Sequence, residues 1–532
     1  MTRQNICIAR RTLSACIAAG WLLLLFAGPL TAAESAIEAD ATAAVVEAPA
    51  GGTDREATGD RPGVPTRSLL ELVRRFADAM LVHGVDRWGD EHTGMLISLL
   101  DRKTLGPFAA LPKAPRGIRA GDRVSLHGAN YNTDQNLYQT LFVLSRVTGD
   151  AKYAKAADAA LADFITRTAS PATGLLAWGE HVCWDLARDN WSSGERQPYH
   201  EMKREMLFWD KHYASHPAQA EAFARGLWAH QIWDQITGDF SRHARYDMHG
   251  PGKGYDFPKE GSYMIQTWAQ AYRDTQAPTF LTALNVLTNR YLGKLNERNL
   301  LEQDSVRTGR NVSLENLSLA THAHEAADRV PAGELADRLR RLAARIDVGF
   351  LALPHDVPRR GFVYFAEPAT GRPQPYSTSP DGYSLTWGKA YGVDMTSCFG
   401  MACFQRTVQL TEGPTKNAYR KLALDAADVY LAAQPDPRST DVWAGEYGAA
   451  VFLQLMAHRL TGHAKYLGGA RRLADEAVQL FFDADNPLPK ASSSCEHYES
   501  ITSTDTLAYA LLALHLEESG DQATVDLGRV IY

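Results

Sequence analysis

The sequence has few cysteines and lacks the short motifs of several large enzyme classes. Among its 532 residues are six cysteines, and no two of them are spaced as C-x-x-C, so a thiolate zinc site is not expected. There is no G-x-S-x-G elbow, no glycine-rich phosphate loop and no H-E-x-x-H helix. Serine hydrolases, nucleotide enzymes and zincins therefore have no support. The net charge of −7 gives no general attraction for nucleic acid or acidic membranes. No stable protein partner is implied.

The first 33 residues have the pattern of an export signal. Arg3, Arg10 and Arg11 make a basic start, and Leu13 to Leu30 is almost entirely apolar. Small residues follow at positions 31–33, as a cleavage site requires. We interpret residues 1–33 as a signal peptide of an exported protein, periplasmic or secreted. An uncleaved anchor is the alternative, since the apolar run is just long enough to span a bilayer.

Four cysteines lie beyond this segment. An exported protein can form disulfides from them, but their spacing reveals no pairing. Disulfides and buried free thiols therefore both stay open for Cys183, Cys398, Cys403 and Cys495.

The composition changes twice along the chain. Residues 34–66 are rich in Ala, Gly, Glu, Asp, Pro and Thr and have no aromatic residue. Such a segment cannot bury enough surface to order itself, so we interpret it as a linker. From Ser68 onward apolar residues recur at spacings of three and four, as in Leu69, Val73, Phe76 and Met80, which predicts helices. We expect residues 67–532 to form one domain.

A short phrase recurs within that domain. An apolar helical pattern ends near Thr-Gly, a turn follows, and an aromatic residue begins the next helix. The copies are Leu144–Tyr153, Met456–Tyr466 and, more weakly, Tyr272–Phe280 and Val408–Tyr419. Repeated helical hairpins predict an all-α fold, an α/α toroid, with an irregular helical bundle as the alternative. The Pro-, Gly- and aromatic-rich stretch Phe362–Tyr383 predicts a small loop or β excursion over one end.

Chemically reactive side chains arrive together on three stretches, which run from Trp178 to His181, from Tyr199 to Lys203 and from Ser241 to Arg245. They supply a histidine, a glutamate and a second histidine, which is a mixed nitrogen and oxygen set suited to Mn, Co, Fe or Zn rather than to calcium. The arginine directly before the second histidine is placed to contact an acidic substrate. The three stretches therefore predict a metal-assisted enzyme that acts on an anionic sugar.

In this order and spacing, the three stretches resemble polysaccharide lyase family 2, the bacterial pectate lyases with an α/α barrel. In that family a histidine, a glutamate and a histidine from the three motifs hold the metal, and the arginine before the last histidine is the base. The resemblance implies a divalent transition metal, Mn²⁺ with Co²⁺ or Ni²⁺ as alternatives. The implied ligands are His181, Glu201 and His243, and the implied catalytic base is Arg242, for which a carboxylate-clamping role is the alternative. The sequence departs from the family at Glu180, where a small residue is expected.

The resemblance implies cleavage of polygalacturonate, or a related uronate polymer or oligomer, by β-elimination. Trp178, Arg245 and Lys259 are candidates for contacting this acidic polysaccharide. Packing between helices is the competing interpretation for the tryptophan, and a solvated charge is the competing one for the other two. Glu205, one helical turn after Glu201, is the alternative carboxylate ligand.

Two other functions stay open. The segment Cys495–Glu499, together with Asp381 or Asp394, would supply paired carboxylates for a glycoside hydrolase on the same barrel acting on uronic-acid oligosaccharides. Such an enzyme needs no divalent ion and makes no unsaturated product. The other possibility is a sugar-binding homologue without turnover, which would show metal-dependent binding and no product.

Overall fold

All described residues belong to one compact unit, Val64–Tyr532. The computed structural model describes residues 68–123, 125–193, 198–250, 254–304, 309–376, 379–388, 395–436, 441–521 and 525–529. The expected signal peptide 1–33 and linker 34–66 lie outside these residues. Within them, no helix is both long and apolar enough to cross a membrane.

Helices make up most of this unit. Their bounds are α1 Leu69–Ala79, α2 Tyr131–Thr148, α3 Ala151–Arg167, α4 Trp209–Ser215, α5 Pro217–Gly226, α6 Pro258–Thr275, α7 Pro278–Lys294, α8 Ser313–Arg329, α9 Glu334–Leu351, α10 Thr396–Gln409, α11 Pro414–Ala432, α12 Ala444–Thr461, α13 Ala464–Phe481 and α14 Thr504–Ser519. The predicted start of helical structure near Leu69 is confirmed, because the Ser68 side chain accepts a hydrogen bond from the Glu71 amide and so caps α1.

The recurring phrase forms the turns of helical hairpins, as predicted. In two of them the first helix ends at a glycine in the left-handed conformation, Gly149 after α2 with φ 71° and Gly462 after α12 with φ 69°. Asp150 then caps α3 by accepting from the Lys152 amide. In the weaker copy after α6 the left-handed residue is Gln276, with φ 55°. The sequence pattern therefore marks the hairpins even where glycine is replaced.

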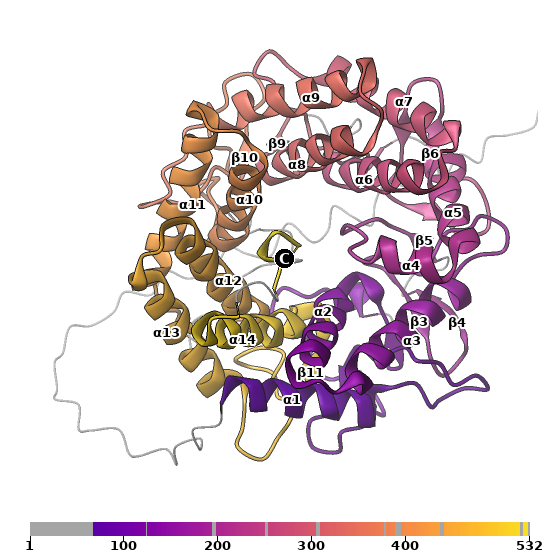
Figure 1. Ribbon diagram of the computed structural model, residues 1–532, viewed down its shortest axis with the longest axis vertical. Coiled ribbons are helices and arrows are strands. Elements are labelled where there is room, and N and C mark those ends of the chain that lie inside the picture. The colour runs from indigo at the N-terminus through magenta and orange to yellow at the C-terminus, as the bar shows by residue number, and fades with distance from the viewer. Residues whose placement is uncertain are drawn as a thin grey trace, which may run out of the picture. The chain divides into compact units, whose positions relative to one another are not determined.

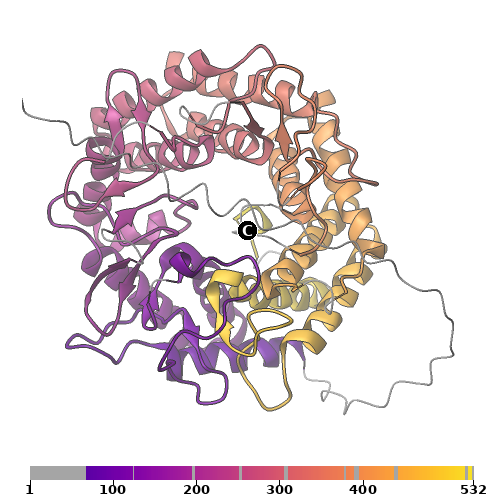
Figure 2. The same cartoon turned by 180° about the vertical axis from the view of Figure 1, so that it is seen from behind.

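The hairpins form a ring, which Figure 1 and Figure 2 show from its two sides. Within it α6 packs on α8, α8 on α10, α10 on α12, α12 on α14, and α14 on α2. Helices such as α14 are buried on nearly every face, whereas outer helices such as α9 bury one face. A helix that is apolar all round is one that is covered all round. The expected α/α toroid is confirmed, and the irregular bundle is excluded.

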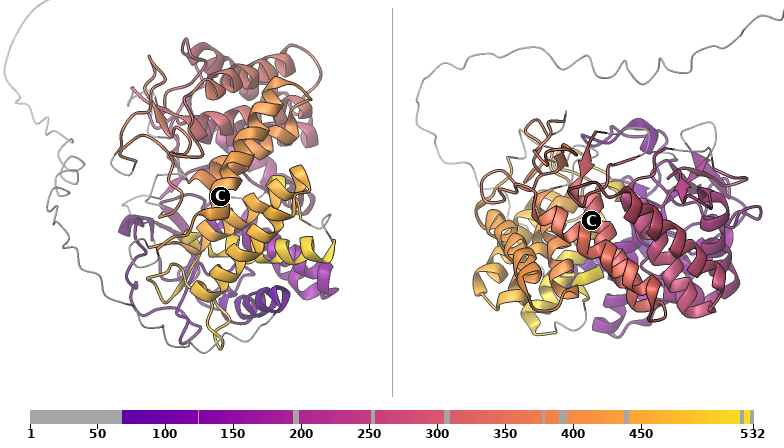
Figure 3. Two further views of the ribbon diagram at one scale, coloured as in Figure 1. Left: turned by 90° about the vertical axis from the view of Figure 1, so that its left-hand side faces the viewer. Right: turned by 90° about the horizontal axis from the view of Figure 1, so that it is seen from above.

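Short strands lie within the loops that connect the helices, and Figure 3 shows these loops at one end of the helices. Their bounds are β1 Leu99–Leu100, β2 Gly128–Ala129, β3 Val182–Asp185, β4 Asn190–Ser193, β5 Tyr199–His200, β6 Ile232–Asp234, β7 Asp239–Phe240, β8 Ala244–Arg245, β9 Asn311–Val312, β10 Phe365–Ala366 and β11 Tyr498–Glu499. β3 pairs with β2 and β4, β5 with β8, β6 with β7, β9 with β10, and β1 with β11. The predicted excursion at Phe362–Tyr383 contains β10 and an isolated bridge between Val363 and Tyr383.

The core contains the four cysteines that the sequence left open. Cys183, Cys398, Cys403 and Cys495 are all buried free thiols. Burial raises the pKa of Cys183 and of Cys403 above the ordinary thiol value, so both stay protonated and unreactive. Packing, rather than cross-linking, is the role of these residues.

Candidate metal centre

A two-residue strand pair places the second and third motifs beside each other. β5 pairs with β8 in antiparallel register, with Tyr199 opposite Arg245 and His200 opposite Ala244. One step further in this register, Glu201 faces His243. The Nε2 atom of His243 lies 3.7 Å from Oε1 of Glu201. Local pairing therefore brings together two groups that are 42 positions apart in the sequence.

The first motif joins them through the backbone. The Glu201 amide donates to the Trp178 carbonyl at 2.8 Å, and the Glu180 amide lies 3.3 Å from Oε2 of Glu201. Gly179 permits this approach, because a Cβ atom there would lie only 3.0 Å from Cβ of Glu201. His181 follows directly before β3 and faces the same carboxylate.

His181, Glu201 and His243 each offer a ligand atom, and these three atoms lie within 4.8 Å of one another. Oε1 of Glu201 is buried and accepts no hydrogen bond, and Nε2 of His243 is buried and neither donates nor accepts one. Nδ1 of His181 is 3.2 Å from Oδ1 of Asp122, which leaves its Nε2 for another partner. Buried polar atoms that make no hydrogen bond are costly, although the charge of Arg242 partly compensates Oε1 of Glu201. Two imidazoles with one carboxylate are ligands for a divalent transition ion. The residues therefore fit such a metal.

Arg242 lies against the same carboxylate. Its Nη1 is 2.7 Å from Oε1 of Glu201, although no N–H is directed so that it makes a hydrogen bond to that oxygen. The guanidinium lies over the ring of Phe257, 4.9 Å from its centre, and the Arg242 amide donates to the Tyr255 carbonyl. The backbone and an aromatic face thus hold the arginine beside the candidate metal ligands.

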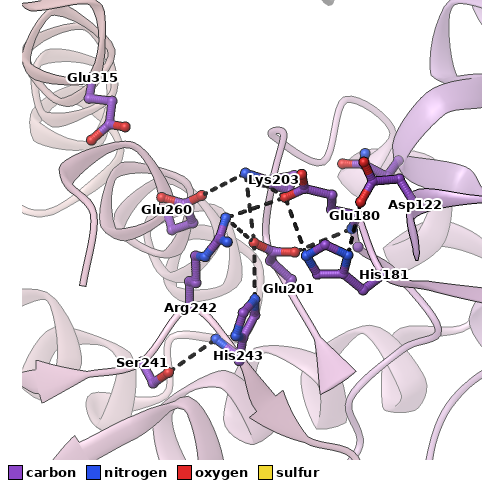
Figure 4. A network of polar contacts seen from close by, with 12 residues as sticks. Asp122, Glu180, His181, Glu201, Lys203, Ser241, Arg242, His243, Glu260 and Glu315 are labelled. Carbon is purple, nitrogen blue, oxygen red and sulfur yellow. Dashed lines mark hydrogen bonds and ion pairs between the residues drawn. The ribbon is translucent and has the colours of Figure 1, made fainter. Parts of the chain in front are cut away.

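Further charged groups complete the site, as Figure 4 shows. Lys203 Nζ is 2.9 Å from Oε2 of Glu180 and 3.9 Å from Oε1 of Glu260. Oε1 of Glu180 is 2.7 Å from Nη2 of Arg119. These residues, with Asp122, are absent from the ligand set that the sequence suggested. For two of these residues the sequence did offer a signal, since Lys203 and Glu180 lie within the motifs themselves.

Burial and charge together set the protonation of the ligand atoms. Burial raises the pKa of Glu201, but Arg242, Lys203 and the two histidines outweigh it and hold this pKa below the ordinary value. Burial lowers the pKa of His243 to about 4, so its imidazole is neutral near neutral pH. Burial also lowers the pKa of His181, but the contact with Asp122 and the nearby glutamates hold it above the ordinary value.

The other sequence candidates lie elsewhere. Trp178 is fully buried, its ring packs edge-on against Tyr131, and its Nε1 donates to Asn132. The expectation that it contacts a sugar is wrong, because the apolar run before it carries it into the core. Arg245 is paired with Asp247 at 3.1 Å.

Lys259 and Glu205 line a cavity with Arg204, Tyr263 and His322. Oε2 of Glu205 accepts from Gln266 at 2.6 Å. No regular helix runs from residue 201 to residue 208, so Glu205 does not lie one helical turn from the ligand position, and it is not in the ligand cluster.

The carboxylates that the glycoside hydrolase alternative would use are bound to neighbouring side chains, where the structure describes them. Glu499 binds Arg123 at 2.6 Å and His497 at 2.9 Å, and all three are buried. Asp381 is 3.4 Å from Arg360. Asp394 lies outside the described residues. Glu499 is therefore engaged on both oxygens by neighbouring side chains.

Residues 116–290 match the family model described as periplasmic pectate lyase. The match contains all three motifs and confirms the resemblance to polysaccharide lyase family 2 over this segment. Among solved structures, a D-mannose isomerase is similar with a TM-score of 0.44 and 10% identity, over 85% of this chain and 99% of that one.

An unsaturated glucuronyl hydrolase specific for heparin has a TM-score of 0.41 and 10% identity, over 86% of this chain and 97% of that one. An α-1,6-mannanase from Salegentibacter sp. HEL1_6 has a TM-score of 0.41 and 9% identity, over 84% and 100%. At these values the likeness says nothing about the activity of this chain.

Proposed function

We propose that this protein is an exported, metal-assisted polysaccharide lyase that cleaves polygalacturonate, or a related uronate polymer, by β-elimination. The observation that carries the proposal is the convergence of His181, Glu201 and His243 beside Arg242. The family match over the same segment supports it. The matched family is described as periplasmic, which agrees with the export signal expected at residues 1–33.

In the reaction the base takes the C5 proton of a uronate and the electron pair of that bond forms a C4–C5 double bond. The bond from C4 to the glycosidic oxygen breaks, and the departing oxygen takes a proton from water. A divalent transition ion, with Mn²⁺ first among the candidates, would supply the positive charge that neutralises the uronate carboxylate and stabilises the negative charge developing beside it. His181, Glu201 and His243 would hold that ion. Asp122 would fix His181 through Nδ1, which keeps Nε2 directed into the site.

Arg242 is the proposed base. Burial lowers its pKa, but Glu201, Glu260 and Glu180 outweigh burial and hold that pKa above the ordinary value. The side chain must therefore lose part of this carboxylate contact before it can accept a proton. Its fixed backbone and its position over Phe257 keep the guanidinium in place while that happens.

The test is a screen of acidic polysaccharides with and without Mn²⁺, in which the ultraviolet absorbance of a 4,5-unsaturated uronate is followed. The proposal predicts absorbance that depends on the metal. Reducing ends formed without this absorbance would favour the hydrolase alternative. Metal-dependent binding without any product would establish a sugar-binding homologue.

A further inference from the structure

The Glu180 side chain lies among three positively charged side chains of the site. Its Oε1 is 2.7 Å from Nη2 of Arg119. Its Oε2 is 2.9 Å from Nζ of Lys203 and 3.3 Å from Nη1 of Arg242. One protein carboxylate thus contacts three cationic side chains, and 7% of its side chain is exposed.

These cations come from three different parts of the chain. Arg119 precedes a turn before β2, Lys203 follows β5, and Arg242 precedes β8. Each cation also contacts a second carboxylate, which is Asp122, Glu260 or Glu201. Three cations that converge on one nearly buried point nevertheless attract an anion to that point. In this structure the filling anion is a side chain of the protein.

The same position borders the candidate metal ligands. Oε2 of Glu180 is 3.8 Å from Nε2 of His181, the imidazole atom left for the metal. A uronate carboxylate drawn toward these cations and the metal therefore meets Glu180. Two charged carboxylates this close repel each other, and the repulsion is stronger where both are poorly solvated.

Glu180 can leave the position without dismantling the site. Its amide, rather than its side chain, contacts Oε2 of Glu201, so a change of its side chain keeps that contact. Arg119, which contacts Oε1, is half exposed and keeps its two hydrogen bonds to Asp122, each at 3.1 Å, when Glu180 moves. Lys203 keeps Glu201 and Glu260 as neighbours at 3.8 and 3.9 Å.

We infer that Glu180 is a specificity-determining residue: it occupies the anion position formed by Arg119, Lys203 and Arg242, and a substrate carboxylate enters only by displacing it. The inference rests on the proposed function for its substrate class. It follows that the protein binds fully charged polyuronate more weakly than its cations alone would allow. Sugars whose carboxylates are methyl-esterified do not compete with Glu180 and lose less affinity.

The experiment compares the full protein with Glu180→Gln, which has nearly the same shape and no charge. Both are assayed with Mn²⁺ on ester-free polygalacturonate and on highly methyl-esterified pectin. Removal of one like charge is expected to lower KM for polygalacturonate about tenfold, with a much smaller change in kcat. The ratio of kcat/KM for the ester-free over the esterified polymer should rise by a similar factor.

Glu260→Gln is the matched control. It removes the same charge from the same cluster and also acts on Arg242, but of the three cations its carboxylate forms an ion pair with Lys203 alone, at 3.9 Å. If both variants shift the ratio equally, net charge rather than the occupied position is responsible, and the inference is wrong. It is equally wrong if Glu180→Gln leaves the ratio unchanged or raises KM for polygalacturonate.

A binding measurement separates this inference from the proposed function. Trigalacturonate is titrated calorimetrically into each protein in excess chelator, where no turnover occurs. The inference predicts binding to Glu180→Gln that is tighter by about tenfold than binding to the unchanged protein, and equal or weaker binding contradicts it. If no uronate polymer yields an unsaturated product, the proposed function fails, and this titration still decides the role of Glu180.

Discussion

At the scale of single residues, the proposed function gives different roles to the candidate metal ligands and to the candidate base. His181 offers Nε2 to the ligand cluster, whereas Arg242 contacts that cluster through Glu201. Arg242→Ala should therefore abolish formation of unsaturated product and leave Mn²⁺ binding largely intact, while His181→Ala should remove both. Product absorbance and calorimetric Mn²⁺ titration measure the two effects. Full activity in Arg242→Ala would show that the base is misassigned.

Asp122 contacts the proposed metal ligand His181 through the ring nitrogen that does not face the metal position. Its Oδ1 lies 3.2 Å from Nδ1 of His181, and 1% of its side chain is exposed. Asp122→Asn keeps the shape but removes the charge that fixes the imidazole, so the affinity for Mn²⁺ should fall about 10- to 100-fold. Competition with a fluorescent chelator measures this affinity. Asp122 also forms an ion pair with Arg119 at 3.1 Å, and an unchanged affinity would mean that it serves only this pair.

The residue scale is also where prediction from the sequence reached its limit. His181, Glu201 and His243 were predicted as a set because each lies in a distinctive motif, and the structure brings them together. Lys203 and Glu180 lie in the same motifs, but the direction of their side chains depends on the strand pairing. Nothing in the sequence fixes that pairing between segments so far apart.

At the scale of elements, the contact between α2 and α14 buries two carboxyl groups. Burial and the charge of Asp134 raise the pKa of Asp505, in the first turn of α14, to about 7. Burial likewise raises the pKa of Asp134, in the first turn of α2, to about 6. Each group is thus neutral in the folded protein at a pH where it is charged in the unfolded chain.

This arrangement makes stability depend on pH. The folded-state pKa of Asp505 lies above its ordinary value of 3.8. Its contribution to the free energy of unfolding is therefore fully present below about pH 4 and is lost as the pH rises through about 7. Asp505→Asn does not titrate, so Tm of the variant minus Tm of the unchanged protein should grow between these pH values. Thermal unfolding at a series of pH values measures the difference. A difference independent of pH would contradict the account of this contact.

Element-scale features were predictable where the signal was local. Thr148-Gly149-Asp150 contains a helix end, a left-handed stop and a cap within three residues, and the hairpin it predicts is present. The helical turn expected between Glu201 and Glu205 is absent, because the chain there leaves β5 and runs along the site. A spacing of four residues in the sequence does not by itself distinguish a helical turn from an irregular segment.

At the scale of the whole described unit, the ring of hairpins gives the site a rigid support. The motif residues lie on short strands and loops, while α14 packs on α2 and thereby closes the ring. The toroid was predictable because its repeats are similar to one another. Its loops were not, since each differs in length and sequence, and these loops carry the candidate metal centre.

The central claim is that His181, Glu201 and His243 hold a divalent ion that this protein needs for β-elimination on a uronate polymer. The most direct measurement follows unsaturated product from polygalacturonate after exhaustive treatment with chelator and again after addition of Mn²⁺. The account predicts no product after chelation and recovery with the metal. Undiminished product formation in excess chelator would contradict it.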